Sequence, residues 1–325
     1  MVMDILWGVI NDFWPARADE FSIESILPAS LEGKVIIVTG ATNGIGQRMA
    51  SEICLRGADV YFAARSRTKA DKVISELKSQ NPAIRATYLP YNADSLQDVY
   101  DSAKAFLATT KQLDVLINNA GTSEFVYSRT VDGVEKMFGV NHLAYFMFTT
   151  TIWPAIAKPN GRVVNVSSAA HVFYRDKTLG LDDVGTKYEE QHFTPMFYSR
   201  SKAANILFTS ELARRADKVF VNCCHPGTIR TGLVADKGFK LLDFIMNWFV
   251  YPLGGISIEK GTVNALFCGF HKEIEEKQFS GHYFTLFGYD YQPSNIASDE
   301  ALAEGLWNYS AEFCVKVVPS WRFDA

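Results

Sequence analysis

A tyrosine and a lysine four residues apart, Tyr198 and Lys202, are the side chains in this sequence best suited to acid–base chemistry. They open a run of good helix formers, residues 203–215, and on a helix two residues at this spacing rise from one face. A free phenol has a pKa of about 10, but a nearby ammonium favours the phenolate and lowers that pKa. The pair therefore predicts proton transfer to or from an alcohol oxygen. Because such a pair is more often an ordinary solvated helix face, the rest of the chain must support this interpretation.

A glycine-rich turn follows the first predicted strand. The strand, residues 34–39, is β-branched and uninterrupted, as in a buried parallel sheet, and a helix-compatible segment, 47–56, follows the turn. A strand, turn and helix in this order direct backbone N–H groups and the positive end of a helix towards a pyrophosphate. We therefore predict that this turn binds a nucleotide. The predicted contacts are Gly40, Thr42, Asn43, Gly44, Ile45 and Gly46.

The next predicted strand, residues 59–64, ends at Arg65 rather than at an acidic residue. A carboxylate there would accept hydrogen bonds from a ribose diol, whereas a guanidinium binds a 2′-phosphate through charge-assisted, bidentate contacts. The sequence therefore predicts NADP(H) rather than NAD(H). Arg67 and Lys69 could add to the positive field, although a solvated loop is the simpler interpretation.

Small and polar residues also follow the predicted strands 86–90 and 113–117. Ligands of open α/β sheets bind at the carboxyl ends of the strands, so we expect these residues to line one crevice. Asp94 is expected to cap a helix that begins near Leu96. The candidates for contacts with adenine and ribose are Asn92, Ala93, Asn119, Ala120 and Gly121.

Two further positions could take part in the chemistry. Ser167 and Ser168 follow the predicted strand 162–166, where one hydroxyl can bind the reacting oxygen or can simply cap a turn. Asn141 lies in the apolar middle of a helical pattern over residues 131–157. A buried asparagine needs hydrogen-bond partners, so it either makes a structural bond or holds a water for proton exchange.

The last two predicted strands and the segment between them are expected to supply the remaining cofactor contacts and a lid. After the strand 218–224, a rigid turn supplies hydroxyls that can reach a cofactor, and a strand at 281–284 completes the sheet. The apolar stretch 239–253 is too short and too polar at two positions to span a membrane, and is expected to form a lid over an apolar substrate. The predicted cofactor contacts in the turn are Pro226, Gly227, Thr228 and Thr231.

The composition is that of a globular protein, with 48% hydrophobic and 21% charged residues. The formal charge of -4, without a block of basic residues, gives no reason to expect nucleic-acid binding. The five cysteines have neither zinc nor redox spacing, which favours reduced thiols in the cytoplasm and no metal site. No apolar run reaches the roughly 20 residues that a membrane span needs.

These patterns predict an α/β fold, a single doubly wound, Rossmann-type parallel sheet with helices on both faces. Residues 1–30 are expected to be an N-terminal appendage, with a short helix ending near Trp14, that docks on the body or touches lipid. The nucleotide-binding domain is predicted over 31–288, with the lid at about 232–257, and the tail 289–325 is expected to pack on its outside.

The order of these motifs resembles the short-chain dehydrogenase/reductase (SDR) family. The segments at 140–143, 165–168 and 201–205 are most similar to its retinol-dehydrogenase-like branch. The matching motifs are Thr39-Gly40-x-x-x-Gly44-x-Gly46, Asn118-Asn119-Ala120-Gly121, Asn141, Ser168, Tyr198-x-x-x-Lys202 and Pro226-Gly227. The resemblance implies a catalytic tetrad of Asn141, Ser168, Tyr198 and Lys202, the last two also touching the cofactor. It also implies a homodimer through the helices near 131–157 and 196–215. Asn92 replaces the aspartate that is common in the family.

The predicted function is an NADP(H)-dependent oxidoreductase that interconverts a carbonyl and an alcohol on a lipophilic small molecule, such as a retinoid, steroid, fatty aldehyde or secondary metabolite. Tyr198 exchanges the proton, Ser168 orients the oxygen, Lys202 lowers the phenol pKa and binds ribose, and Asn141 positions a water. The alternatives are a catalytically silent NADP-binding regulator and an NADP-linked epimerase or dehydratase. The protein is expected in the cytoplasm, with peripheral contact to a membrane or lipid droplet left open.

Overall fold

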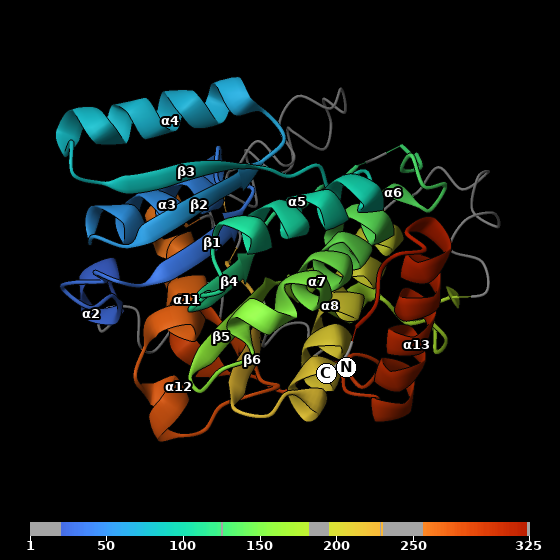
Figure 1. Cartoon of the computed structure of the whole chain (residues 1–325). Coiled ribbons are helices and arrows are strands. Elements are labelled where there is room, and N and C mark those ends of the chain that lie inside the picture. Colours follow the sequence, from blue (N-terminus) through green and yellow to red (C-terminus); the bar gives the residue numbers. More distant parts are fainter. Residues whose placement is uncertain (1–20, 125, 182–194, 228, 230–255, 324–325) are drawn as a thin grey trace.

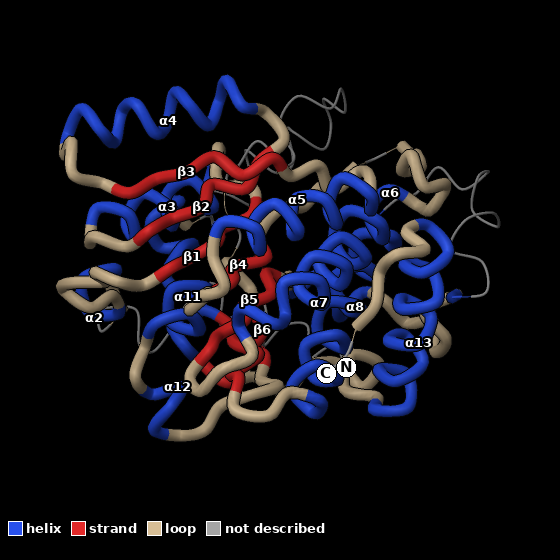
Figure 2. The backbone as a smooth tube through the Cα atoms, in the orientation of Figure 1, coloured by secondary structure: helices blue, strands red, loops and turns tan. Residues whose placement is uncertain are grey.

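The computed structural model describes residues 21–124, 126–181, 195–227, 229 and 256–323 of the 325-residue chain (Figure 1). At its centre is an eight-stranded sheet in the order β3-β2-β1-β4-β5-β6-β7-β8, drawn in red in Figure 2. The strands are β1 (Val35–Thr39), β2 (Asp59–Ala64), β3 (Arg85–Pro90), β4 (Val115–Asn118), β5 (Gly161–Val166), β6 (Val219–Cys224), β7 (Tyr283–Thr285) and β8 (Tyr289–Asp290).

The predicted doubly wound sheet is confirmed. Neighbouring strands from β3 to β7 pair in parallel. From β1 the chain adds β2 and β3 on one side, and it then crosses to the other side of β1 to add β4 and the later strands. The sheet ends in one element that the sequence did not predict, because the two-residue strand β8 pairs antiparallel with β7. In sheets of this kind the ligand crevice lies at the carboxyl ends of the strands, beside the point where the chain crosses over.

Helices cover both faces of the sheet (Figure 1). One face packs against α3 (Gly44–Leu55), α4 (Arg67–Gln80) and α11 (Ile258–Phe270), and the other against α5 (Leu96–Thr109), α7 (Ala144–Ile156) and α8 (Pro195–Arg215). Each face has its own apolar core. The short helices α2 (Ile23–Ile26) and α12 (Glu273–Glu276) join the first of these cores, through buried Ile23 and Ile274.

Serine and aspartate side chains cap the N-termini of several helices by accepting hydrogen bonds from backbone N–H groups. Ser66 and Ser95 cap α4 and α5 in this way, and Asp299 caps α13 (Glu300–Val317). The expectation that Asp94 caps α5 was wrong, because the neighbouring Ser95 accepts the Asp98 N–H at 3.2 Å. Asp94 instead forms an ion pair with Lys136.

The predicted continuous helix over 131–157 was also wrong in its first half. The chain turns at Gly133, whose φ is +82°, and then forms α6 (Lys136–Phe138), a π-helix (Gly139–Leu143) and α7. Gly139 packs so closely on this turn that an added Cβ would lie 2.5 Å from Thr130 Cγ2. Single π-helical turns are frequent at functional sites, and this one contains Asn141.

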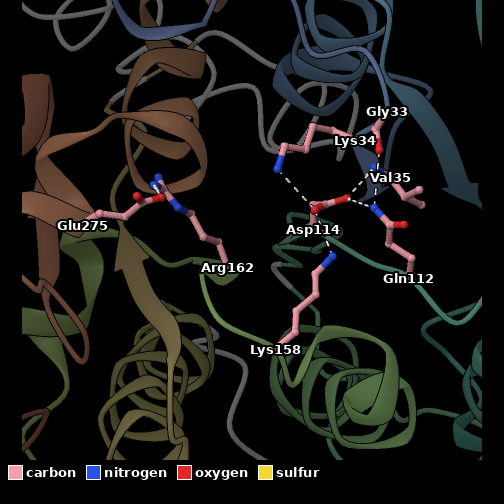
Figure 3. Close-up of polar contacts among 8 residues, drawn as sticks. All are labelled: Gly33, Lys34, Val35, Gln112, Asp114, Lys158, Arg162 and Glu275. Atoms are coloured by element: carbon pink, nitrogen blue, oxygen red, sulfur yellow. Dashed lines mark hydrogen bonds and ion pairs between the residues drawn. The ribbon is translucent and has the colours of Figure 1, made fainter.

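Hydrogen bonds and ion pairs join residues at the amino ends of the strands, the ends opposite to the crevice, and Figure 3 shows these contacts. Asp114 accepts the Val35 N–H at 2.8 Å and pairs with Lys158 at 2.9 Å. Burial acts to raise the pKa of Asp114, but these partners outweigh it and hold the pKa below its ordinary value. On the neighbouring strand, buried Arg162 pairs with Glu275 of α12 at 2.6 Å.

Both ends of the described chain pack on the body. Near the amino end, Phe21, Ile23 and Leu27 are buried against the core that contains α11. Near the carboxyl end, α13 packs on α8, where Trp307 stacks on Phe208 with ring centroids 6.1 Å apart. The helix predicted to end near Trp14 lies outside the described residues.

The helices expected to form a dimer have a partner within the chain. Twelve residues of α7 are buried, and α13 covers α8, placing the Arg215 guanidinium 4.5 Å from the Trp307 ring. The dimer itself stays a prediction, but α13 already covers the part of the expected interface that α8 would supply. Among the described helices, none is long and apolar enough to cross a membrane.

Candidate functional site

A cavity of about 640 Å³ lies at the carboxyl ends of the strands, and most of the predicted site residues line it. Gly46 and Asn141 do not line it directly, whereas Thr228, Thr231 and most of the expected lid lie outside the described residues. The predicted residues in its wall are Gly40, Thr42, Asn43, Gly44, Ile45, Arg65, Asn92, Ala93, Asn119, Ala120, Gly121, Ser168, Tyr198, Lys202, Pro226 and Gly227.

The glycine-rich turn and the β4 end are locked together by hydrogen bonds. Asn119 Nδ2 donates to the Thr39 carbonyl oxygen at 2.8 Å, and Thr39 Oγ1 accepts the Asn119 N–H at 2.9 Å. An added Cβ on Gly46 would lie 2.3 Å from Asn119 Nδ2 and 2.4 Å from the Gly40 oxygen. Gly46 therefore permits this close packing, and its predicted contact with a cofactor stays a prediction. Gly40 and Gly44 supply the positive φ angles of the turn, +69° and +56°.

Arg65 is exposed at the end of β2, where it borders the cavity. Among the described residues its guanidinium has no hydrogen-bond or ion-pair partner. Arg67, in contrast, pairs with Asp71 at 3.5 Å and lies over the Tyr88 ring. Of these two arginines, Arg65 is thus the one available to an anionic ligand.

The Asn92 amide is held by the protein. Its Nδ2 donates to Asp98 Oδ2 at 2.8 Å, and its Oδ1 accepts the Asp94 N–H at 3.4 Å. The adenine contact expected of Asn92 stays a prediction, and its amide N–H group is shared with Asp98.

Helix α8 presents Tyr198 and Lys202 to the cavity from one face. Tyr198 is partly exposed there, whereas Lys202 is only 4% exposed and its Nζ donates to the Val166 carbonyl oxygen at 2.9 Å. The ammonium nitrogen lies 5.6 Å from the centroid of the Tyr198 ring. The four-residue spacing on α8 and the hydrogen bond to the end of β5 therefore hold the Lys202 ammonium beside the Tyr198 ring.

The two serines after β5 have different partners. Ser167 Oγ donates to the Lys202 carbonyl oxygen at 2.7 Å and so anchors α8. Ser168 accepts the Ala170 N–H at 3.2 Å, and its side chain also hydrogen-bonds with that of Tyr198. Ser168 is therefore the serine that can share an oxygen ligand with the tyrosine.

The protein environment shifts both titrating groups away from their charged forms. Burial raises the pKa of Tyr198 to about 12, a rise that the Ser168 hydrogen bond partly opposes. Burial lowers the pKa of Lys202 to about 8. The lowering of the phenol pKa by Lys202 stays a prediction, because burial dominates the pKa of Tyr198 in these surroundings. Tyr198 is thus a protonated phenol at neutral pH, suited to donating a proton.

Asn141 joins the β4 end to α8 from the π-helix. Its Nδ2 donates to the Thr122 carbonyl oxygen and to Ser201 Oγ, both at 2.9 Å, while its Oδ1 accepts the Thr122 N–H at 2.8 Å. Ser201 in turn donates to the Tyr198 carbonyl oxygen at 2.8 Å. The side chain makes the structural bonds that were one of the two interpretations of Asn141.

Sequence reasoning missed a buried polar chain behind the site. Asn118 Nδ2 donates to Asn165 Oδ1 at 2.9 Å, and Asn165 Nδ2 donates to Thr209 at 3.0 Å. Asn205 Nδ2 also reaches the Val166 oxygen, at 3.3 Å. The signal in the sequence was asparagine inside strands that are otherwise apolar. Glu124, Lys136 and His225 also line the cavity, without any motif that marks them.

The chain is similar to known dehydrogenases over most of its length. The short chain dehydrogenase family model matches residues 34–177. The short chain dehydrogenase/reductase dpchH of Colletotrichum higginsianum is 34% identical over 304 residues, which cover 86% of this chain and 75% of that protein. Human retinol dehydrogenase 11 is also 34% identical, over 87% of this chain and 86% of its own length.

Solved structures share the fold. A protein of uncharacterised function from Mycobacterium paratuberculosis is 27% identical with a TM-score of 0.69, over 90% of this chain and 97% of its own. A short chain dehydrogenase from Burkholderia cenocepacia in complex with NADP is 23% identical with a TM-score of 0.61, over 79% of this chain and 98% of its own. The chain therefore belongs to the short-chain dehydrogenase/reductase family of oxidoreductases and is retinol-dehydrogenase-like.

Proposed function

We propose that the chain is an NADP(H)-dependent oxidoreductase that interconverts a carbonyl and an alcohol on a lipophilic small molecule. One observation carries this proposal: Tyr198, Lys202 and Ser168 line the same cavity as the glycine-rich turn. A proton donor and an oxygen-binding hydroxyl thus share a space with a turn whose geometry suits a dinucleotide.

The residues in the cavity wall fit such a cofactor. Gly40 and Gly44 leave the backbone open beside the start of α3, where helix N–H groups attract phosphate oxygens. Arg65 offers a guanidinium that has no partner within the described ranges of the chain and that suits a 2′-phosphate. When bound, NADP(H) supplies or accepts the hydride, which no amino-acid side chain provides.

The protein's own groups would handle the oxygen and its proton. Ser168 binds the carbonyl oxygen and orients it towards Tyr198, whose hydroxyl donates the proton during reduction. Lys202 reaches the same cavity and favours the anion that Tyr198 leaves behind. Asn141 positions Tyr198 through Ser201, and its predicted role in holding a water would add to this one.

At neutral pH a protonated Tyr198 suits the reductive direction, in which its hydroxyl acts as an acid. With a pKa of about 12, the phenol is almost fully protonated and ready to act as an acid. The oxidative direction needs the phenolate, which becomes more populated as the pH rises. We therefore expect oxidation of an alcohol to accelerate with pH far more strongly than reduction of the corresponding carbonyl.

A lipophilic substrate is supported by the relatives and by exposed apolar side chains. Several relatives are named retinol dehydrogenases. Phe173 and Met196 are 53% and 47% exposed on the segments that flank Ser168 and Tyr198 in the sequence. Contact of residues 1–14 or 239–253 with lipid stays a prediction, because both segments lie outside the described residues.

A substrate screen tests the proposal. The purified chain is mixed with NADPH and a panel of apolar aldehydes and ketones, and absorbance at the reduced nicotinamide band is followed, with NADH as the control. We expect consumption of NADPH in step with alcohol formed, and a slower reaction with NADH. Product formed without net NADPH loss would favour an epimerase, and binding without any turnover would favour a regulator.

A further inference from the structure

A buried ion pair lies behind Tyr198 and Lys202 on α8. Arg200 stands midway between them, about 200° around the helix from each, so its side chain leaves the opposite face. Its Nη2 lies 3.2 Å from Oε2 of Glu135, and both side chains are only 2% exposed. The guanidinium carbon lies 5.3 Å from the ring centroids of both Phe138 and Phe197. The pair is thus enclosed between α8 and α6.

Glu135 connects this pair to the turn that carries Asn141. Its two carboxylate oxygens accept the first free backbone N–H groups of α6, at 2.7 and 2.9 Å, and α6 runs directly into the π-helix. Asn141 of the π-helix donates to Ser201 at 2.9 Å. Two adjacent residues of α8, Arg200 and Ser201, are therefore held by the same short segment.

Stability alone does not account for a buried ion pair at this place. Removing two charges from water costs about as much as their attraction returns, and apolar replacements are often neutral or stabilising. The Glu135–Arg200 pair instead fixes the orientation of α8 relative to α6, because a carboxylate that already caps α6 accepts a guanidinium only in a narrow range of geometries. Displacing reacting groups by about 1 Å can cost about 100-fold in rate.

We propose that Glu135 and Arg200 are positioning residues, which hold α8 against the Asn141 segment and thereby set where Tyr198 and Lys202 meet the substrate. This inference rests on the proposed oxidoreductase function. Neither Glu135 nor Arg200 is among the described residues that line the cavity, so both act through others. Their removal should change the chemical step and leave the contacts that the glycine-rich turn and Arg65 make with the cofactor in place.

The test is the double variant Glu135→Gln/Arg200→Met, compared with the full-length wild type. It removes both charges of the pair together, so neither is left buried without the other, and the glutamine oxygen can still cap α6. We expect kcat for an apolar carbonyl to fall about 10- to 100-fold, with NADPH affinity and the urea unfolding midpoint unchanged. Arg200→Lys keeps the charge without the planar fork and should give an intermediate kcat. The control Arg214→Met removes an exposed arginine that pairs with buried Glu211 at the far end of α8, where Arg215 keeps that glutamate paired, and it should keep the wild-type kcat.

Each outcome decides one question. A folded double variant with the wild-type kcat overturns the positioning role and leaves the proposed function intact. Parallel losses of kcat, NADPH affinity and stability mean a structural role only, which also overturns it. If the double variant does not fold, Arg200→Lys decides, since a wild-type kcat there contradicts the proposal and a reduced kcat at unchanged NADPH affinity supports it. A wild type without turnover on any carbonyl overturns the function, and the positioning role falls with it.

Discussion

Replacing Lys202 by methionine is expected to stabilise the folded chain while it removes turnover. Burial lowers the pKa of Lys202 from its ordinary value of 10.5 to about 8, because the charged form is poorly solvated there. At about 1.4 kcal/mol per pKa unit, keeping this ammonium at pH 7 costs the fold about 3 kcal/mol. The Val166 carbonyl oxygen keeps a second donor, Asn205 Nδ2 at 3.3 Å, so the substitution leaves no buried acceptor unpaired. Stability and function are therefore opposed at this position.

The stabilisation should depend on pH with a definite sign. The folded-state pKa of Lys202 lies below the unfolded-state value, so between about 8 and 10.5 the unfolded chain binds more protons. The cost of the buried ammonium is therefore complete below pH 8 and disappears as the pH rises towards 10.5. The extra stability of Lys202→Met should fall from about 3 kcal/mol at pH 7 to about 1 kcal/mol at pH 9.5.

Urea denaturation of both proteins at the two pH values measures this difference. Buried tyrosines and cysteines also titrate at alkaline pH, but they are shared by both proteins and cancel in the comparison. Lys104→Met, which removes an exposed lysine from α5, is the matched control and should show no such pH dependence. A variant less stable than the wild type at both pH values, or a difference that does not change with pH, would refute the reasoning.

Three further changes test other parts of the structure. Arg65→Ala should raise the KM for NADPH about 10- to 100-fold and leave that for NADH unchanged, and equal effects on both would remove Arg65 from 2′-phosphate binding. Asp114→Asn should cost about 1–3 kcal/mol in urea at pH 7. Because the folded pKa of Asp114 lies below 3.8, this loss should shrink as the pH falls through that folded pKa, and a loss that persists in acid would contradict it. Gly46→Ala should weaken NADPH binding in a fluorescence titration and lower stability by about 1–3 kcal/mol, because its Cβ would meet Asn119 Nδ2 at 2.3 Å; wild-type binding and stability would show that the turn can relax.

Much of the sheet could be predicted because its strands are short apolar runs with local turn signals. The runs that form β1 and β2 consist mostly of apolar residues, so their composition alone predicts that they are buried. The glycine-rich turn was predictable for the same reason, since strand, turn and helix follow one another in sequence. The family membership followed from motifs of this local kind, and the comparisons confirm it.

Errors arose where distant residues decide the outcome. Apolar periodicity from 131 onwards suggested one helix, but the turn at Gly133 and the packing of Gly139 on Thr130 break it. The spacing of Tyr198 and Lys202 also does not report how deeply the fold buries the phenol, and this burial raises its pKa. The Glu135–Arg200 pair joins residues 65 positions apart, and no local pattern marks such a contact.

The most direct test of the central claim is turnover by Tyr198→Phe, which removes one hydroxyl from a ring that otherwise stays in place. A reactive carbonyl from the substrate screen and NADPH are supplied to the variant and the wild type, and NADPH affinity is measured in parallel. We expect unchanged NADPH binding and a kcat lower by at least about 100-fold, as for loss of a general acid. Turnover at the wild-type rate with intact NADPH binding would contradict the proposed role of the phenol.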